Sequence, residues 1–184
     1  MDEELVSVPL NRALQIGPPT SVVLATCISL EGKPNIITLG MYMPISHEPP
    51  LIVIGVSPRR YSHQLIIETA QFVVNVPTED IVEQTVFCGT VSGRTHDKFK
   101  EAGLTPVPAN MVKPPLIKEC VSSLECKVTA KYTCGDHTLF VGEVVAAHVK
   151  KGMLKDTLDA LKAQTISHKG PYYFVPKLIY QVEP

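Results

Sequence analysis

The stretch 35–62 (NIITLGMYMPISHEPPLIVIGVSPRRYS) restricts the possible folds more strongly than any other part of the chain. Segments 35–43 and 51–56 are rich in β-branched residues. The second is apolar at almost every position, which predicts a strand covered on both faces. The prolines between them, beginning with Pro44, lack an amide donor and fix φ, so we expect both strands to stop at this loop. The stretch therefore predicts two consecutive strands joined by a proline-rich loop.

A polar and cationic turn directly follows the second of these strands. Its two guanidinium groups, Arg59 and Arg60, stand between the hydroxyl groups of Ser57 and Ser62. Guanidinium groups, hydroxyls and free backbone amides at the end of a strand suit a phosphate ligand. Two solvated loop cations are the alternative, and the residues alone leave both interpretations open. If the first holds, a ligand site lies at the rim of a sheet.

Length and composition narrow the class of protein. The 184 residues are 45% hydrophobic and 19% charged, which is enough material for one domain with a core. We expect a single domain over residues 1–184, with its core at about 20–150 and a C-terminal extension at 151–184. A net charge of −1 gives no indication of nucleic-acid binding. No apolar run approaches the roughly 20 residues of a membrane span.

The cysteine content and the first residues indicate the compartment. Five cysteines, an odd number, favour reduced thiols over a disulfide framework. The chain starts MDEELVSV, which is acidic and unlike a signal peptide. We therefore expect a cytoplasmic protein.

The remainder of the chain predicts short strands and short helices. Strands are expected at 21–30, 71–76, 117–134 and 138–151, and helices at 63–70, 78–89, 95–102 and 153–163. We expect Ser62 to cap the first helix and residues 65–67 to pack inward. Because the elements do not alternate as βαβ units do, we predict a mainly β fold in which an antiparallel sheet closes into a barrel with helices around it.

Common catalytic and nucleotide-binding motifs are absent from the sequence. It contains no GxGxxG, no GxxxxGK[ST] and no HExxH, and its cysteine spacings match no zinc site. The GTVSG segment at 89–93 differs by one residue from a nucleophile elbow and follows a helix, which argues against a serine hydrolase. Taken by themselves, residues 92–99 can be explained without a functional role, as a helix with a capping residue and one side chain in the core. Asn75, in an apolar strand, needs partners that are either neighbouring backbone groups or a ligand.

Six motifs occur together in the order and spacing of a known family. They are PNIITLGMYMP, PPLIVIGVSPRRYS, ETAQFVVNV, CGTVSGRTHDKF, SSLECKV and VGEVV. On these motifs, which cover about residues 20–150, the chain resembles the flavin reductase-like proteins of the FMN-binding split-barrel fold, a group that includes flavoredoxin and an archaeal ferric reductase. Many members carry a His-containing P-L-x-Y-x segment near the end, where this chain has Gly170, Pro171, Tyr172 and Tyr173.

The resemblance implies a homodimer of antiparallel, Greek-key-like split β-barrels with FMN near the subunit interface. Carried over by position, the residues expected to line the isoalloxazine are Asn35, Thr38, Gly40, Met41 and Tyr42. Those expected to hold the phosphate are Ser57, Arg59, Arg60 and Ser62, and those expected to complete the pocket are Ser92, Lys98 and Phe99. These positions suit a flavin, because Gly40 permits a close approach and a strand edge supplies amides.

The function implied by the resemblance is that of an FMN-dependent oxidoreductase. NAD(P)H would supply electrons, and the flavin would pass them to free flavin, ferric iron or another acceptor. Because the cofactor carries this chemistry, we expect no side chain to act as a catalytic acid or base. An FMN-binding electron carrier that serves protein partners without nicotinamide turnover is the alternative. A flavin-free split barrel with a structural or ligand-binding role is a third.

Overall fold

The computed structural model of the chain describes residues 5–181. Its centre is a seven-stranded antiparallel sheet in the order β3-β2-β6-β9-β10-β5-β4. The strands are β2 (Val23–Ile28), β3 (Pro34–Leu39), β4 (Tyr42–Ser46), β5 (Leu51–Val56), β6 (Gln71–Val76), β9 (Ser122–Cys134) and β10 (His137–Val149). The sheet curls until β3 and β5 approach each other without pairing, so that one edge of β3 has no partner strand among residues 5–181.

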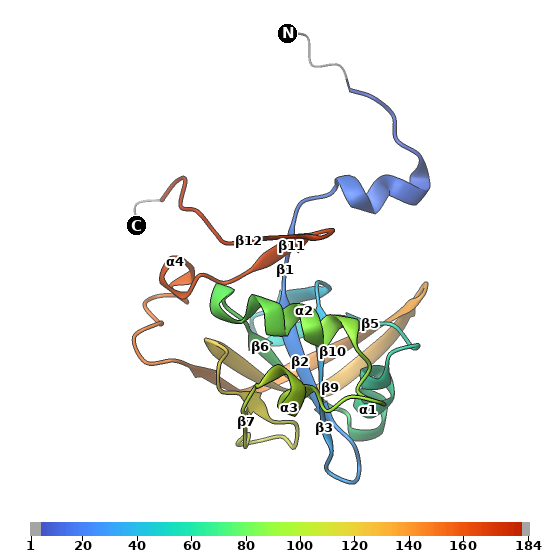
Figure 1. Cartoon of the computed structure of the whole chain (residues 1–184), viewed down its shortest axis with the longest axis vertical. Helices are drawn as coiled ribbons and strands as arrows, with labels where there is room; N and C mark the ends of the chain where they lie inside the picture. The colour runs from blue at the N-terminus through green and yellow to red at the C-terminus, as the bar shows by residue number, and fades with distance from the viewer. Residues whose placement is uncertain (1–4, 182–184) are drawn as a thin grey trace.

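Short elements surround this barrel. The helices are η1 (Leu10–Ile16), α1 (Tyr61–Thr69), η2 (Glu79–Ile81), α2 (Val82–Thr90), α3 (Lys98–Ala102) and α4 (Ala160–Ala163), and the remaining strands are β1 (Thr20–Ser21), β7 (Pro106–Val107), β8 (Leu116–Ile117), β11 (Ser167–Lys169) and β12 (Tyr172–Phe174). β1 pairs with β11, so two segments far apart in the sequence meet at one end of the molecule (Figure 1). Among residues 5–181, no helix is long and apolar enough to span a bilayer.

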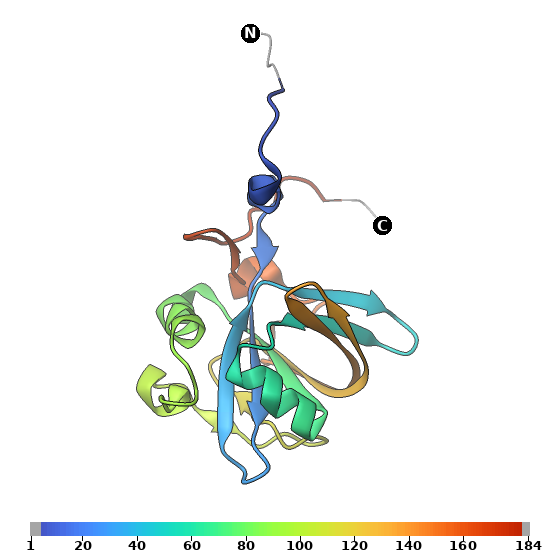
Figure 2. The same ribbon diagram turned by 90° about the vertical axis from the view of Figure 1, so that its right-hand side faces the viewer.

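Two apolar clusters lie on the two faces of the sheet. Successive side chains of a strand point to opposite faces, so Ile37 packs inside the barrel while Ile36 packs outside it. The inner cluster includes the buried rings of Phe72 and Phe140. The outer cluster lies beneath α2 and α3, which Figure 2 shows on the side of the sheet away from the projecting β4–β5 hairpin. β3 is therefore held from both faces while its edge stays free.

The predicted strand 35–43 is wrong, because the chain forms two strands there. β3 pairs with β2, and β4 pairs with β5 at the other end of the sheet order. The chain crosses between them at Gly40 and Met41, where the Gly55 amide donates to the Met41 carbonyl at 3.0 Å. Pro44 was expected to end a strand, yet it lies within β4. β4 is an edge strand, so some of its backbone positions need no amide donor.

The helix predictions need three corrections. α1 begins at Tyr61, so Ser62 lies inside it and is not its cap, and Ile67 is 42% exposed, whereas Leu65 and Ile66 are buried. The predicted helix 95–102 begins at Lys98, because Asp97 caps it by accepting from the Lys100 amide. Of the predicted helix 153–163, only α4 forms, since the Asp159 carboxylate caps the chain there. Leu154, which suggested the longer helix, is 60% exposed.

Asn75 is a structural residue of the outer layer. Its amide nitrogen donates to the Leu24 carbonyl at 3.1 Å, and its oxygen accepts from the Ile117 amide at 3.0 Å and the Ser123 hydroxyl at 2.7 Å. These bonds satisfy a side chain that is fully buried. Of the two interpretations left open by the sequence, the neighbouring protein groups are the partners.

Candidate functional site

A cavity of about 1440 Å³ lies along the free edge of β3. Its walls are β3, the turn after β5, the start of α1, the loop after α2, the β9–β10 turn and the segments next to β1 and β11. At about 3.3 Å per residue, the lining from Asn35 to Gly40 extends for about 16 Å. Ligand pockets usually measure about 300–1,000 Å³, so this cavity can hold a molecule the size of a nucleotide.

One end of the cavity is cationic. Arg59 and Arg60 are exposed in the turn between β5 and α1, and Ser57 and Ser62 lie beside them on the wall. Arg60 occupies the N-cap position of α1 and makes no side-chain cap hydrogen bond. The first amides of an uncapped helix point outward and favour an anion. The turn therefore combines two guanidinium groups, two hydroxyls and a helix N-terminus.

Lys98 adds a buried cation to the same region. Its side chain is 5% exposed, and its ammonium donates to the carbonyl oxygens of Ile36 at 2.8 Å and Cys88 at 2.6 Å. No carboxylate within residues 5–181 forms a salt bridge with it. Burial lowers the pKa of Lys98, and the Arg60 guanidinium lowers it further. A buried charge without a counterion is costly, and an anion in the cavity would compensate it.

Asn35 carries an unused hydrogen-bond acceptor. Its amide nitrogen donates to the Ser62 hydroxyl at 2.7 Å, which fixes the side chain. Its Oδ1 atom is buried and has no hydrogen-bond partner among the described residues. Gly93 lies so close that a Cβ there would overlap this oxygen. A ligand hydroxyl or N–H group is the kind of partner that this oxygen needs.

The other end of the cavity lies where the chain crosses from β3 to β4. Gly40 and the half-exposed side chain of Met41 line it together with His168 of β11. A Cβ at Gly40 would overlap the His168 ring and Thr20 Oγ1, so the close approach at this glycine is made by the protein itself. The Thr38 hydroxyl donates to the Thr85 carbonyl at 2.6 Å and ties β3 to α2.

The structure brings ten of the twelve predicted site residues to one cavity. They are Asn35, Thr38, Gly40, Met41, Ser57, Arg59, Arg60, Ser62, Ser92 and Lys98. It does not bring Tyr42 or Phe99 there. Tyr42 packs against the inner core, because its position in β4 points it into the barrel, and Phe99 is buried in the outer core beneath α3.

Several other residues that line the cavity could not be predicted from the sequence. Asp136 and His137 reach the cavity from the β9–β10 turn and are joined by a 2.7 Å hydrogen bond. This bond, together with the nearby Arg59 guanidinium, lowers the pKa of Asp136. His168 and Arg12 come from opposite ends of the chain but line one cavity, because β1 pairs with β11 and the Lys169 ammonium donates to the Leu14 carbonyl at 2.8 Å. No local pattern in the sequence signals that these two segments lie together.

The thiol in the cavity wall is not a nucleophile. Burial raises the pKa of Cys88 to about 11, although Lys98 partly opposes this effect. The same cause raises the pKa of Cys27, which lies behind Asn35, to about 11. Both thiols stay protonated near neutral pH, and a protonated thiol reacts poorly. The cavity therefore offers no thiolate for covalent chemistry near neutral pH.

Comparisons with known proteins identify the family. The model of the flavin reductase like domain matches residues 17–174, and the chain belongs to this family. An uncharacterised protein of Archaeoglobus fulgidus is 42% identical over 120 residues, 65% of this chain and 67% of the relative. An NADH-dependent FMN reductase of Streptomyces nodosus subsp. asukaensis is 28% identical over 154 residues, 84% of this chain and 77% of the relative.

The solved structures agree with the family match. Flavoredoxin from Methanosarcina acetivorans superimposes with a TM-score of 0.86 at 28% identity, covering 97% of this chain and 95% of that chain. The prediction of an antiparallel split barrel with short helices is confirmed. The protein is thus a split-barrel member of a flavin-binding family of oxidoreductases.

Proposed function

We propose that the protein is an FMN-dependent oxidoreductase that takes electrons from NAD(P)H. The observation that carries the proposal is the buried cation of Lys98, which has no carboxylate partner among the described residues and shares one cavity with Arg59, Arg60 and the start of α1. Three cations and an uncapped helix suit the phosphate of a flavin mononucleotide. The electrons would leave the flavin for free flavin, ferric iron or another acceptor.

The residues of the cavity suit the parts of FMN. Ser57, Arg59, Arg60 and Ser62 would hold its phosphate, and the free edge of β3 would supply amides to the ring. The Oδ1 atom of Asn35 would accept a hydrogen bond from it. FMN supplies the electron-transfer chemistry, while these residues bind and orient it. The Lys98 cation would favour negative charge on a ligand in the cavity.

Three further features belong to the proposal. We expect the chain to act as a single domain, which the one family match over residues 17–174 supports. We expect a homodimer in which the flavin lies near the interface. We place the protein in the cytoplasm, because its five cysteines are free thiols and a reducing compartment keeps thiols in that state.

An FMN-binding electron carrier is the second candidate. Its support is the similarity to flavoredoxins, at 25% identity to that of Desulfovibrio vulgaris and 28% to that of Methanosarcina acetivorans. Such a protein would exchange electrons with protein partners and would not oxidise a nicotinamide nucleotide itself. Its cavity would bind FMN through the same residues.

Anaerobic reduction distinguishes the two candidates. The protein is loaded with FMN, and its visible spectrum is recorded after addition of NADH or NADPH. The oxidoreductase proposal predicts rapid bleaching by at least one nucleotide, with the faster one identifying the donor. A bound flavin that stays oxidised until dithionite is added would contradict it and support the electron carrier. Loading with FAD in parallel tests the choice of flavin.

A further inference from the structure

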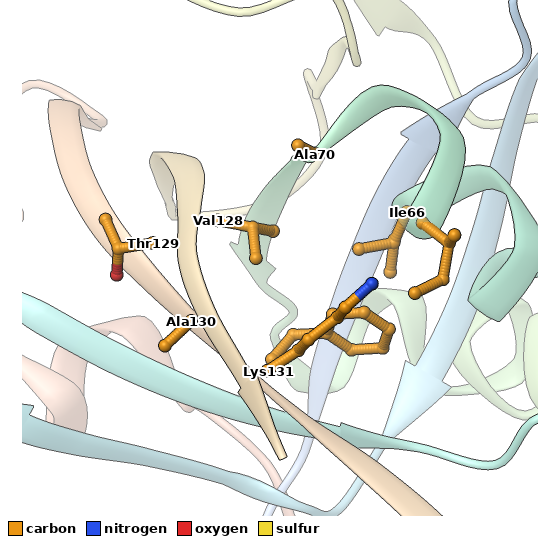
Figure 3. Close-up of a pocket in the computed structure, with 8 residues that line it drawn as sticks. Ile66, Ala70, Val128, Thr129, Ala130 and Lys131 are labelled. Atoms are coloured by element: carbon orange, nitrogen blue, oxygen red, sulfur yellow. The ribbon is translucent and has the colours of Figure 1, made fainter. Parts of the chain in front are cut away.

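A second cavity, of about 230 Å³, lies at the C-terminal end of α1, opposite the cationic turn that precedes this helix. It is bounded by the last turn of that helix and by the β9–β10 hairpin (Figure 3). Its lining residues are Ile66, Ile67, Ala70, Val128, Thr129, Ala130, Lys131 and Phe140. None of them lines the first cavity. The two cavities are therefore separate sites.

The walls of the second cavity are apolar. Ile66 and the Phe140 ring are each 1% exposed and form its base. Val128 and Ala130 contribute half-buried aliphatic groups from β9. The one hydroxyl of the lining, on Thr129, donates to the Val141 carbonyl at 3.4 Å and so already has a partner. Such walls favour a hydrocarbon or an aromatic ring over a sugar or a phosphate.

Lys131 gives the cavity a single charged group. Figure 3 shows its side chain extending across the cavity toward Ile66. The imidazole of His63 lies nearby, edge-on to the Phe140 ring at a centroid distance of 5.3 Å. Burial lowers the pKa of His63, and the charge of Lys131 lowers it further. No carboxylate among the described residues forms a salt bridge with Lys131. Its ammonium is therefore available to an anionic group bound in this apolar cavity.

The backbone is irregular where α1 and the β9–β10 hairpin meet at the cavity. Ala70 has a left-handed conformation with φ of 52°, which is uncommon for a residue other than glycine. Its carbonyl accepts from the Val128 amide at 2.9 Å and fixes the end of α1 against β9. The register of β9 and β10 skips Thr129, so a β-bulge lies at the same place. These features place irregular backbone on both sides of the cavity, at the end of α1 and in β9.

We propose that this cavity binds a small aromatic carboxylate, with its ring against Ile66 and Phe140 and its carboxylate paired with Lys131. An apolar cavity of about 150 Å³ is known to hold benzene. The space of about 230 Å³ here is open to solvent on one side and suits a benzene ring with one small substituent. The Lys131 ammonium selects a negative substituent. The site is independent of the proposed oxidoreductase activity, since it shares no residue with the flavin cavity.

Benzoate is the probe that tests this site. It is titrated into the FMN-loaded protein, and into the protein without FMN, while backbone amide resonances are followed by NMR. We expect saturable shifts at residues 66–70 and 128–131 with and without FMN. Absence of saturable shifts there at up to tens of millimolar benzoate would overturn the proposal. Shifts confined to the flavin cavity would overturn it as well, without affecting the proposed function.

Two variants and a control assign the contacts. Lys131→Met should weaken benzoate binding about fivefold, as expected for an ion pair near the surface, and should leave the binding of neutral toluene unchanged. Ala130→Phe should fill the cavity and abolish the binding of both probes. Lys127→Met, on the same strand but outside the cavity, should bind benzoate like the unaltered protein. If Lys131→Met binds benzoate with unchanged affinity, the assignment is wrong, whatever the outcome for Ala130→Phe.

Discussion

At the scale of single residues, Lys98 is the side chain that most directly supports the proposal of an anionic ligand. Its ammonium lies in the cavity wall, bonded to two carbonyl oxygens and to no carboxylate among residues 5–181. Lys98→Met should weaken FMN binding by about 10- to 100-fold, because a buried charge-assisted interaction is lost. Titration of flavin fluorescence measures this affinity. Lys100→Met, an exposed position on the same helix, is the matched control, and equal losses in both variants would contradict this role of Lys98.

The same residue predicts a pH dependence of binding. The pKa of Lys98 is lowered by burial in the protein without a ligand, and an adjacent phosphate would raise it again. FMN binding should therefore be strongest below the lowered pKa, and it should weaken as the pH rises through that value and the ammonium loses its proton. Flavin titrations across the alkaline range test this. An affinity with no alkaline decline, or the same decline in Lys98→Met, would exclude the explanation.

The buried carboxylate of Glu125 leads us to expect that the fold is sensitive to acid. Its fully buried carboxylate accepts from the amides of residues 110–112 at 2.6–3.1 Å and from His148 at 2.6 Å. Burial alone would raise the pKa of Glu125, but these hydrogen bonds outweigh it and the pKa is lowered. The stabilisation is thus complete above the ordinary pKa of about 4.5 and is lost as the pH falls through the lowered value.

Glu125→Gln should reduce the free energy of unfolding by about 2–3 kcal/mol at pH 7. The difference in the free energy of unfolding between Glu125→Gln and the unaltered protein should become smaller in acid, because the native carboxylate then loses its own contribution. Urea denaturation at pH 7 and at about pH 4 gives both values. A gap of the same size at both pH values would show that ionisation of Glu125 is not its cause.

At the scale of elements, the loop between α2 and α3 closes the cavity because Gly93 carries no side chain. A Cβ there would overlap Asn35, which Ser62 holds in place. Gly93→Ala should therefore cost about 1–3 kcal/mol of stability by overpacking, and it should weaken FMN binding as the loop moves away. Gly17→Ala, where a Cβ meets no atom closer than 3.8 Å, is the control. Thermal unfolding and flavin titration of both variants test this, and similar behaviour of the two would contradict it.

The elements also show how far sequence patterns reach. The β-branched run of β5 and the cationic turn after it were predictable, because both depend on neighbouring residues. The break between β3 and β4 was not, since it arises where the barrel requires the chain to cross from β2 to β5. The leucine spacing at 153–163 suggested a helix where most of the segment is loop. The helical spacing of these leucines was not enough to form a helix, because the segment has no surface to pack against.

At the scale of the whole molecule, contacts between residues far apart in the sequence could not be predicted from local sequence patterns. The cationic end of the cavity comes largely from one stretch, 57–62, and the sequence predicted a cationic turn there. The far end is assembled from residues 12–20 and 168–172, which approach each other through the pairing of β1 with β11. Tyr42 and Phe99 were misplaced for a related reason, because the choice between the core and the cavity depends on how strands and helices pack in three dimensions.

The exposed N-terminal segment predicts where a homodimer would form. Leu10 and Leu14 of η1 are 91% and 89% exposed, and this short helix buries none of its residues. A helix of this length is not stable without packing, so we expect a second copy to cover it. Leu10→Asp combined with Leu14→Asp should convert a dimer into the 20.1 kDa monomer. Light scattering after size-exclusion chromatography measures the mass.

Leu30→Asp is the control for this prediction. Leu30 is 70% exposed in the β2–β3 turn, at the end of the molecule away from the N-terminal segment (Figure 1). It should leave the dimer intact. A monomeric unaltered protein, or a doubly substituted protein that remains dimeric, would exclude the N-terminal segment as the interface.

We propose above all that the cationic end of the cavity holds the phosphate of FMN. Riboflavin has the same ring and lacks the phosphate, so the decisive measurement compares the affinities of FMN and riboflavin for the unaltered protein and for the Arg59→Ala, Arg60→Ala double variant. We predict that FMN binds the unaltered protein about 100-fold more tightly than riboflavin does. The double variant should lose most of this preference with its riboflavin affinity unchanged. Equal affinities in the unaltered protein, or an undiminished preference in the variant, would contradict the claim.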